Sequence, residues 1–271
     1  MDIEHIGHYV ITRFLSNSKL GFGERIFDED VIQDRLSYLR TYFIPTMNNQ
    51  TVKNFTVIFL INDKHDTKNS GIKELYDMKL DMPFKVLKES EYMKYIRYKT
   101  ADAHKRKLIL TRMDDDDLVN YKAVEEIQKY AIEINNDIFS YGYNSGMILY
   151  EGKLYPFPTP SYRAQGYFSI FESVCVWCES LWPDLNIYSY PHTTLKTDIR
   201  NYAKRHGLNV DHAFERYSLE NFVWIRHKNT STELLTNSPI RNRKLEKEIQ
   251  IDPDRFKLLF GVELDKIILN K

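Results

Sequence analysis

The run Phe55–Ile61 constrains the fold more than any other segment of the 271-residue chain. It is apolar on both faces of an extended strand. A strand of this kind lies in the middle of a parallel sheet, with helices covering both faces. The run therefore predicts an α/β fold.

The rest of the first half alternates between predicted strands and helices. Apolar residues at helical spacing predict a helix over residues 28–44, ended by Pro45, and a second helix from about Asn120. Further strands are expected at residues 8–12, 84–87 and 107–113. This alternation is typical of a mostly parallel central sheet flanked by helices.

The second half is less regular. Strands are expected at residues 138–143, 146–150, 154–157 and from Val223 into a polar loop. A helix is expected to run from Phe168 to Trp182, with Cys175 and Cys178 on its apolar stripe, which favours core packing over a redox or zinc site. Two charged helical patches follow, at residues 241–249 and 253–260. We predict one domain over residues 1–238 and a helical C-terminal extension over residues 239–271, packed on it.

Composition excludes several classes of protein. Basic and acidic residues balance at 38 each, so no bulk positive field attracts nucleic acid. No apolar run is long enough to span a bilayer, and the N-terminus does not have the pattern of a signal peptide. Two cysteines do not suggest a disulfide framework. We expect a cytoplasmic protein, and leave open a peripheral place at a membrane.

The segment Thr111–Asp117 carries the clearest chemical signal. Four consecutive aspartates, Asp114 to Asp117, directly follow a predicted buried strand. Open α/β sheets bind their ligands at the carboxyl ends of such strands. Asp114 and Asp116, two residues apart, are expected to reach one hard cation, which would bridge to a diphosphate. The alternative is a charged, solvated surface turn.

Other polar residues are expected at the same edge of the sheet. Arg13 ends the first strand and suits a phosphate contact, whereas Arg112 suits either phosphate or neutralisation of Asp114. Asp63 follows the Phe55–Ile61 strand; it could bind a base or ribose, or equally well cap a turn. The basic cluster at residues 105–107 suits a solvated face better than a phosphate contact.

A late histidine offers a third metal ligand. His227 follows an apolar and aromatic strand, and a neutral imidazole can join two carboxylates around a metal ion. Lys228 and Ser231 could then contact a diphosphate. The alternative is a structural histidine.

Taken in order, these segments resemble the "putative rhamnosyltransferase" family. The segments that carry the resemblance are Thr12-Arg13-Phe14, Phe43–Thr46 with Gln50-Thr51, Phe55–Asp63, Thr111–Asp117 and Trp224–Asn229. That family is similar to inverting nucleotide-sugar glycosyltransferases of the GT-A fold, so the resemblance implies a GT-A-like, Rossmann-like sheet. The family's Asp-Asn-Asp-Asp block is all aspartate here, which leaves open whether Asp115 joins the metal shell.

The resemblance implies a donor site built around the aspartates. Asp114, Asp116 and His227 would hold Mn²⁺ or Mg²⁺ on the donor diphosphate, and Asp117 would support them or bind the donor sugar. The expected nucleotide-pocket residues are Thr12, Arg13, Asp63, Arg112, Asp115 and Lys228. The donor would be a UDP-, dTDP- or GDP-linked sugar, with rhamnose suggested by the family, and the acceptor a glycan or glycolipid.

An inverting transfer also needs a carboxylate that takes the proton of the acceptor hydroxyl. Asp198 and then Glu172 are the candidates, because both follow the predicted strands of the second half. Tyr141, Tyr143, Tyr162 and Trp224 could stack on sugar faces, although burial is the commoner fate of such residues.

Two other classes of function remain open. An Asp-x-Asp phosphotransferase or phosphatase would use the first aspartate as nucleophile, but Leu118 stands where a hydroxyl-bearing or β-branched residue is expected. A non-catalytic, metal-dependent glycan-binding module would use the carboxylates only as a clamp. Release of phosphate from simple phosphoesters would indicate the first class, and metal binding without turnover the second.

Overall fold

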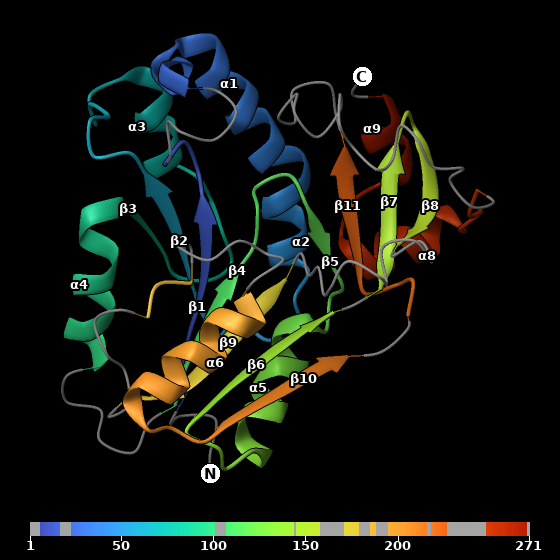
Figure 1. Cartoon of the computed structure of the whole chain (residues 1–271). Helices are drawn as coiled ribbons and strands as arrows, with labels where there is room; N and C mark the ends of the chain where they lie inside the picture. The colour runs from blue at the N-terminus through green and yellow to red at the C-terminus, as the bar shows by residue number, and fades with distance from the viewer. Residues whose placement is uncertain are drawn as a thin grey trace.

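The computed structural model describes residues 6–16, 23–100, 107–143, 145–157, 171–178, 185–187, 195–215, 218–226 and 248–269. These ranges contain a seven-stranded sheet of order β10-β6-β9-β4-β1-β2-β3 and a four-stranded sheet of order β5-β11-β7-β8 (Figure 1). The strands of the large sheet are β1 (Ile6–Arg13), β2 (Thr56–Ile61), β3 (Phe84–Lys88), β4 (Lys107–Arg112), β6 (Ile138–Tyr143), β9 (Glu172–Trp177) and β10 (Val210–Glu215). Only β9 runs antiparallel to its neighbours, which confirms the predicted mostly parallel sheet.

The order of the large sheet places a switch point between β1 and β4. From β1 the chain moves outward to β2 and β3, then returns across β1 to form β4 on the other side. Where strand order reverses in this way, a crevice opens outside the carboxyl ends of the two central strands. Arg13 ends β1 and the aspartates follow β4, so both lie at this switch point.

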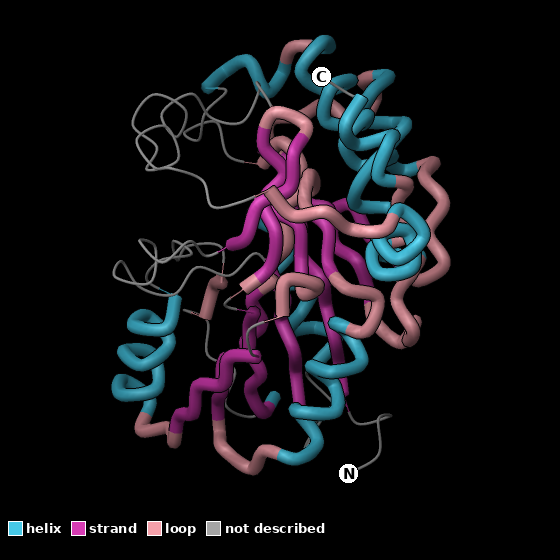
Figure 2. The backbone as a smooth tube through the Cα atoms, turned by 90° about the vertical axis from the view of Figure 1, so that its right-hand side faces the viewer, coloured by secondary structure: helices cyan, strands magenta, loops and turns pink. Residues whose placement is uncertain are grey.

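Helices cover both faces of the large sheet (Figure 2). One face packs against α1 (Glu29–Tyr38), α2 (Ile44–Asn48), α3 (Ser70–Tyr76) and α5 (Ala123–Glu133). The other face packs against α4 (Glu89–Thr100) and α6 (Leu195–His206). Successive side chains of β4 point to opposite faces of the sheet. Ile109 therefore packs in the core on the first face, and Leu108 and Leu110 pack in the core on the second.

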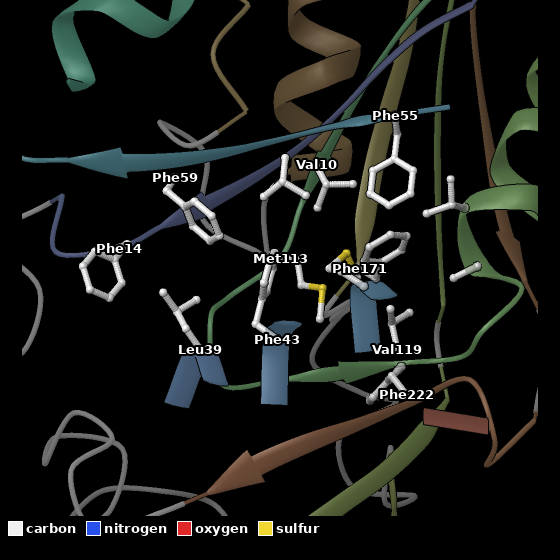
Figure 3. Packing of buried hydrophobic residues seen from close by; sticks show 14 of the residues in the cluster. Val10, Phe14, Leu39, Phe43, Phe55, Phe59, Met113, Val119, Phe171 and Phe222 are labelled. Atoms are coloured by element: carbon white, nitrogen blue, oxygen red, sulfur yellow. The ribbon is translucent and has the colours of Figure 1, made fainter. Parts of the chain in front are cut away.

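Met113 is buried in the first of these cores together with Val10 and Phe43 (Figure 3). This residue directly precedes the four aspartates. Burial of one apolar side chain there fixes the point at which the chain leaves β4, and so fixes where the acidic turn begins.

The prediction that Pro45 ends the first helix was wrong. The chain continues from α1 through a π-helical turn, Leu39–Phe43, into α2, with Pro45 in the first turn of α2. A proline ring in a regular helix clashes with the carbonyl four residues earlier, here that of Thr41. Thr41 lies in the wider π-helical turn, which explains how the helical path accommodates the proline. A short 3₁₀ helix, Gly23–Phe27, precedes α1.

The helix predicted over residues 168–182 was also wrong where the structure describes it. Glu172–Trp177 forms β9, a buried strand that pairs with β4 on one side and β6 on the other. A short apolar run buried on both faces lacks the alternation that separates strand from helix. Cys175 is nevertheless in the core, where burial raises the pKa of its thiol, and both cysteines are free.

The small sheet carries the C-terminal helices. Its strands are β5 (Leu118–Val119), β7 (Gly146–Tyr150), β8 (Lys153–Phe157) and β11 (Phe222–Arg226), and it packs against α8 (Pro253–Phe260) and α9 (Leu264–Leu269). The boundary expected at residues 238–239 lies outside the described residues, so the division into domains stays a prediction. Residues 241–247 of the helix predicted at 241–249 also lie outside them, and residues 248 and 249 are not helical.

Every helix in the described ranges is too short or too polar to cross a bilayer.

Candidate functional site

Three of the four aspartates are buried. Asp115, Asp116 and Asp117 are 0%, 6% and 3% exposed, whereas the side chain of Asp114 is 31% exposed. Asp115 and Asp116 form a turn between β4 and β5. The alternative of a fully solvated surface turn is therefore wrong, because these carboxylates are held inside the protein at the switch point.

Two arginines pair with the aspartates. Arg13 Nη2, from the end of β1, lies 3.4 Å from Asp114 Oδ1. Arg35, from the last turn of α1, forms an ion pair with Asp115, and its Nη1 lies 3.8 Å from Asp116 Oδ2. The sequence pattern identified Arg13 but missed Arg35. Helical periodicity identifies the apolar face of α1, but it does not show which partner a polar side chain of that helix contacts.

Two tyrosines lie beside this ion pair: Tyr38 at the end of α1 and Tyr42 in the π-helical turn that follows it. The Arg35 guanidinium carbon lies 5.8 Å from the centre of the Tyr38 ring, which in turn lies 6.1 Å from the Tyr42 ring. Burial raises the pKa of Tyr42 to about 12, and the negative charges of Tyr38 and Asp116 act in the same direction. The phenol of Tyr42 therefore stays protonated next to the aspartates.

Arg112 and Glu172 form a second acidic and basic pair at the same edge. They are directly opposite each other in the β4–β9 register, and both are buried. Burial raises the pKa of Glu172 to about 8, against the opposing effect of the Arg112 charge. Glu172 Oε2 accepts no hydrogen bond from the described residues. Because β9 is antiparallel to β4, its first residue lies beside the strand end that leads to the aspartates.

The other proton acceptor proposed from the sequence, Asp198, lies elsewhere on the sheet. It is half-buried in the first turn of α6, which packs on β6 and β10. Strand β9 separates β6 from β4. Glu172 is therefore the candidate that shares the edge of β4 with the aspartates.

The surroundings of Asp63 and Thr12 favour a structural role for both residues. Asp63 is exposed, and its Oδ1 accepts hydrogen bonds from Ser90 N at 3.2 Å and Ser90 Oγ at 2.9 Å, at the start of α4. Asp63 therefore acts as a capping residue, as the alternative interpretation expected. It caps helix α4, however, and not the turn that directly follows Asp63. Thr12 is fully buried, and its hydroxyl has no hydrogen-bond partner among the described residues.

The turn after β1 is held in an unusual conformation. Leu15 has a φ of 55°, in the left-handed region that a branched side chain seldom adopts. The Leu15 carbonyl accepts hydrogen bonds from Asn62 N at 3.1 Å and from the His65 ring at 3.2 Å, and the Ser16 carbonyl accepts one from Asn62 Nδ2 at 2.9 Å. These bonds from the β2 side fix the turn beside Arg13.

A chain of buried polar side chains runs beneath the site. Gln128 Nε2 lies 3.3 Å from His8 Nδ1, His8 Nε2 lies 2.7 Å from Thr111 Oγ1, and Thr111 Oγ1 lies 2.7 Å from Ser173 Oγ. Burial lowers the pKa of His8 to about 3, so the ring is neutral. Because the Gln128 amide donates to Nδ1, we assign the ring proton to Nε2, which donates to Thr111. The chain ties α5, β1, β4 and β9 together.

The basic cluster at residues 105–107 is not a solvated face at its described end. Lys107 is 1% exposed, and its Nζ donates to the Ala131 carbonyl at 2.5 Å and to the Ile134 carbonyl. It thus satisfies carbonyls at the C-terminus of α5, where a cation is favourable. Residues 105 and 106 lie outside the described ranges.

Several other expected residues are in the core or outside the described ranges. Tyr141 and Tyr143 are buried in the first core, and Trp224 is 8% exposed, which leaves little of these rings for a sugar. The remaining residues proposed from the sequence lie outside the described ranges: Tyr162, His227, Lys228 and Ser231.

The described residues fit a divalent cation only in part. They contain no group of three or more histidine, cysteine, aspartate or glutamate side chains placed to hold a metal ion. Mg²⁺, however, is usually bound by one or two carboxylates together with substrate phosphates, a number that Asp114 and Asp116 can supply. Of the four carboxylates, Asp114, Asp115 and Asp116 are paired with the two arginines, and Asp117 accepts a hydrogen bond from Ile225 N at 3.3 Å.

The fold and this geometry define the class: an α/β protein with an acidic, arginine-paired site at the switch point of its sheet. Residues 23–210, more than half of the chain, match the family described as "Putative rhamnosyl transferase". The chain belongs to this family and is a glycosyltransferase, which confirms the resemblance seen in the sequence. The segments Thr12-Arg13-Phe14 and Trp224–Asn229 lie outside the match, so these two parts of the resemblance stay untested.

The chain is also similar to solved structures at low identity. A nucleotide-diphospho-sugar transferase from Desulfovibrio desulfuricans G20, itself named "putative", is 12% identical, with a TM-score of 0.44 over 89% of this chain and 91% of that one. TarS from S. aureus, residues 1–349 in complex with UDP, is 12% identical, with a TM-score of 0.40 over 89% and 67%. An inositol-1-phosphate CTP transferase from T. maritima is 11% identical, with a TM-score of 0.42 over 97% of both chains. The search of curated proteins gave no match.

Proposed function

We propose that this protein is a metal-dependent, inverting glycosyltransferase that moves a sugar from a nucleotide-sugar donor to a glycan or glycolipid acceptor in polysaccharide synthesis. The family suggests rhamnose as the sugar. The observation that carries the proposal is the position of Asp114–Asp117, at the carboxyl end of β4 and beside Arg13, at the switch point of the sheet.

In this proposal the donor diphosphate lies at the carboxyl ends of β1 and β4. Asp114 and Asp116 hold Mn²⁺ or Mg²⁺, which when bound neutralises charge on the leaving diphosphate. Arg13 is half-buried beside Asp114 and can turn its planar guanidinium to the phosphate oxygens. Asp63 holds the start of α4 at the β2 side of the pocket. His227 and Lys228 keep the roles expected of them, as a third metal ligand and a diphosphate contact.

Glu172 is the favoured acceptor of the proton from the acceptor hydroxyl. It lies at the edge of β4, and a pKa of about 8 makes its carboxylate a stronger base than an ordinary glutamate. We expect Glu172→Gln to lower kcat by about 100-fold or more, and Asp198→Asn by less than about threefold. The measurement is the initial rate of sugar transfer at pH 8.5. A larger loss of kcat in Asp198→Asn than in Glu172→Gln would make Asp198 the favoured proton acceptor.

The donor site is tested by a thermal-shift and calorimetric screen. UDP, dTDP, GDP and their common sugars are added to the full chain, with and without Mn²⁺. A ligand that binds the folded protein raises its apparent stability by mass action, so one nucleotide should raise Tm only when Mn²⁺ is present. The matched control is the Asp114→Asn/Asp116→Asn variant, which should keep its Tm and lose the nucleotide shift.

Two outcomes would contradict the proposal. Phosphate release from simple phosphoesters without nucleotide binding would indicate the phosphotransferase class. Mn²⁺-dependent glycan binding without turnover of any nucleotide sugar would indicate a binding module.

A further inference from the structure

Arg112 and Glu172 lie on the same face of the large sheet. They are directly opposite each other where β4 pairs with β9, and the Cβ atoms of such pairs are about 5 Å apart. Leu110 and Val174, two residues away along these strands, pack in the second core, so Arg112 and Glu172 continue that face at its end. Both residues are enclosed, at 4% and 3% exposed. Two neighbouring strands therefore hold a buried guanidinium beside a buried carboxylate.

Glu172 receives little charge from its other neighbours. On the side of β6, the next position of the register is Gly142, which has no side chain. The other elements on this face contribute four charged groups: Lys196 and Asp198 of α6, Glu89 of α4 and Arg13 of β1. Among the described residues, Arg112 is nevertheless the one charge that shifts the pKa of Glu172, and it lowers that pKa against the effect of burial.

The surroundings of Arg112 also favour Glu172 as its partner. On the side of β1, the residue opposite Arg112 is the apolar Ile11. Asp114, the nearest aspartate along the chain, is paired with Arg13 at 3.4 Å. Glu172 Oε2 accepts no hydrogen bond from the described residues. Because an uncompensated buried charge is strongly unfavourable, the ionised form of Glu172 depends on the charge opposite it.

We propose that Arg112 is a positioning residue, which holds the ionised carboxylate of Glu172 at the end of β9, where that carboxylate takes the proton of the acceptor hydroxyl. This assignment differs from both interpretations of the sequence, a phosphate contact and neutralisation of Asp114. It rests on the proposed function, since it needs Glu172 to be the proton acceptor. The effect of Arg112 on the ionisation of Glu172 does not depend on that function and is measured without any substrate.

The first test follows the ionisation of Glu172 by urea unfolding. At each pH, the free energy of unfolding of a protein is compared with that of the same protein carrying Glu172→Gln. The pH at which the difference levels off gives the pKa of Glu172 in the folded protein, about 8 in wild type. In Arg112→Met this pKa should be higher by about 1 or more, because a nearby opposite charge lowers the pKa of a carboxyl by about 1–3.

Two further variants are the matched controls. Arg112→Lys keeps the positive charge, and Arg13→Met removes a charge from the same edge one strand further away. Both should keep the pKa of Glu172 within about 0.5 of its wild-type value. If Arg112→Met does not fold, Arg112→Gln takes its place, because glutamine removes the charge and keeps a polar end. An unchanged pKa in the variant that folds, or an equal rise in Arg13→Met, would overturn the proposal.

Kinetics separate positioning from donor binding. The measured reaction is hydrolysis by water of the nucleotide sugar that the thermal-shift screen selects. In Arg112→Met the pH at which kcat reaches half its maximum should rise with the pKa of Glu172, while the donor KM changes by less than about threefold. A donor KM raised by about 10-fold or more, with the pH profile unchanged, would make Arg112 a donor ligand and overturn its positioning role.

Failure of the proposed function would look different. If Glu172→Gln keeps the wild-type kcat, Glu172 is not the proton acceptor, and the catalytic half of the proposal fails with that part of the proposed function. The unfolding measurements then decide the electrostatic half alone. Conversely, an unchanged pKa of Glu172 in Arg112→Met would overturn the proposal in a protein that is a fully active transferase.

Discussion

At the residue scale, the sequence located the acidic turn but not its partners. An apolar strand followed by aspartates is a local pattern, and Thr111–Asp117 was recognised from it. Arg35 is 80 residues from Asp115 along the chain, and only the packing of α1 on the sheet brings the two together. Glu172 was found as an isolated carboxylate, whereas its pairing with Arg112 depends on a strand that the sequence did not reveal.

The burial of Glu172 predicts a pH-dependent stability. Because its pKa is raised from 4.5 to about 8, the folded protein keeps a proton there that the unfolded chain releases. Stability contributed by this group is therefore lost as pH rises from about 4.5 to about 8. Glu172→Gln cannot ionise, so we expect equal stability to wild type at pH 5 and a gain of about 3 kcal/mol at pH 8.5.

The measurement for Glu172→Gln is urea unfolding at several pH values. Glu133→Gln, at an exposed position on α5, is the matched control and should follow wild type at every pH. Parallel curves for Glu172→Gln and wild type would show that Glu172 is ionised in the folded protein.

At the element scale, most strands of the first half could be predicted and several helices could not. Strands β1, β2, β3 and β4 are short apolar runs between breakers, and the predictions at their positions are confirmed. Helix α4 is polar overall and has a weak hydrophobic periodicity. Helix α6 does bury Leu195, Ile199 and Tyr202 at helical spacing, so its pattern was present in the sequence and was overlooked. Strand β9 was mistaken for a helix because its position between two strands is a tertiary property.

The buried polar chain through Thr111 should be costly to interrupt. Thr111 contacts both His8 and Ser173, so Thr111→Val leaves two buried polar groups without their partner at nearly constant volume. We expect it to lower the free energy of unfolding by about 3 kcal/mol, and Ser173→Ala, which removes one contact, by about 1 kcal/mol. Urea unfolding at pH 7 measures both. Equal effects would mean that the His8 contact contributes nothing.

At the scale of the whole molecule, the assembly of the second sheet could not be predicted, although strands at the positions of β7, β8 and β11 were expected. Strand β5 has two residues and pairs with β11, more than a hundred residues later in the chain. No local sequence pattern identifies a strand of only two residues. The helices α8 and α9 then complete its core, and the α8 segment was expected as a helix without its partner being identified.

Docking of these C-terminal helices on the main body depends on one close approach. Gly261 ends α8 with a φ of 74°, and a Cβ atom there would lie 2.7 Å from the Pro45 carbonyl oxygen and 2.7 Å from Asn49 Cβ. Gly207, after α6, has a φ of 66° and open space around it. The two glycines therefore share the same backbone requirement, and only Gly261 is also in close contact with another helix.

This difference separates backbone strain from docking. Gly207→Ala should lower the free energy of unfolding by about 1 kcal/mol through the left-handed backbone alone, and Gly261→Ala by about 3 kcal/mol because α8 must also move away from α2. Urea unfolding gives both values, and hydrogen exchange should be faster in α8 and β5 of Gly261→Ala only. If the two variants are equally stable, the contact between Gly261 and α2 does not hold the C-terminal helices on the body, and their packing rests on the apolar core around Phe256 and Phe260.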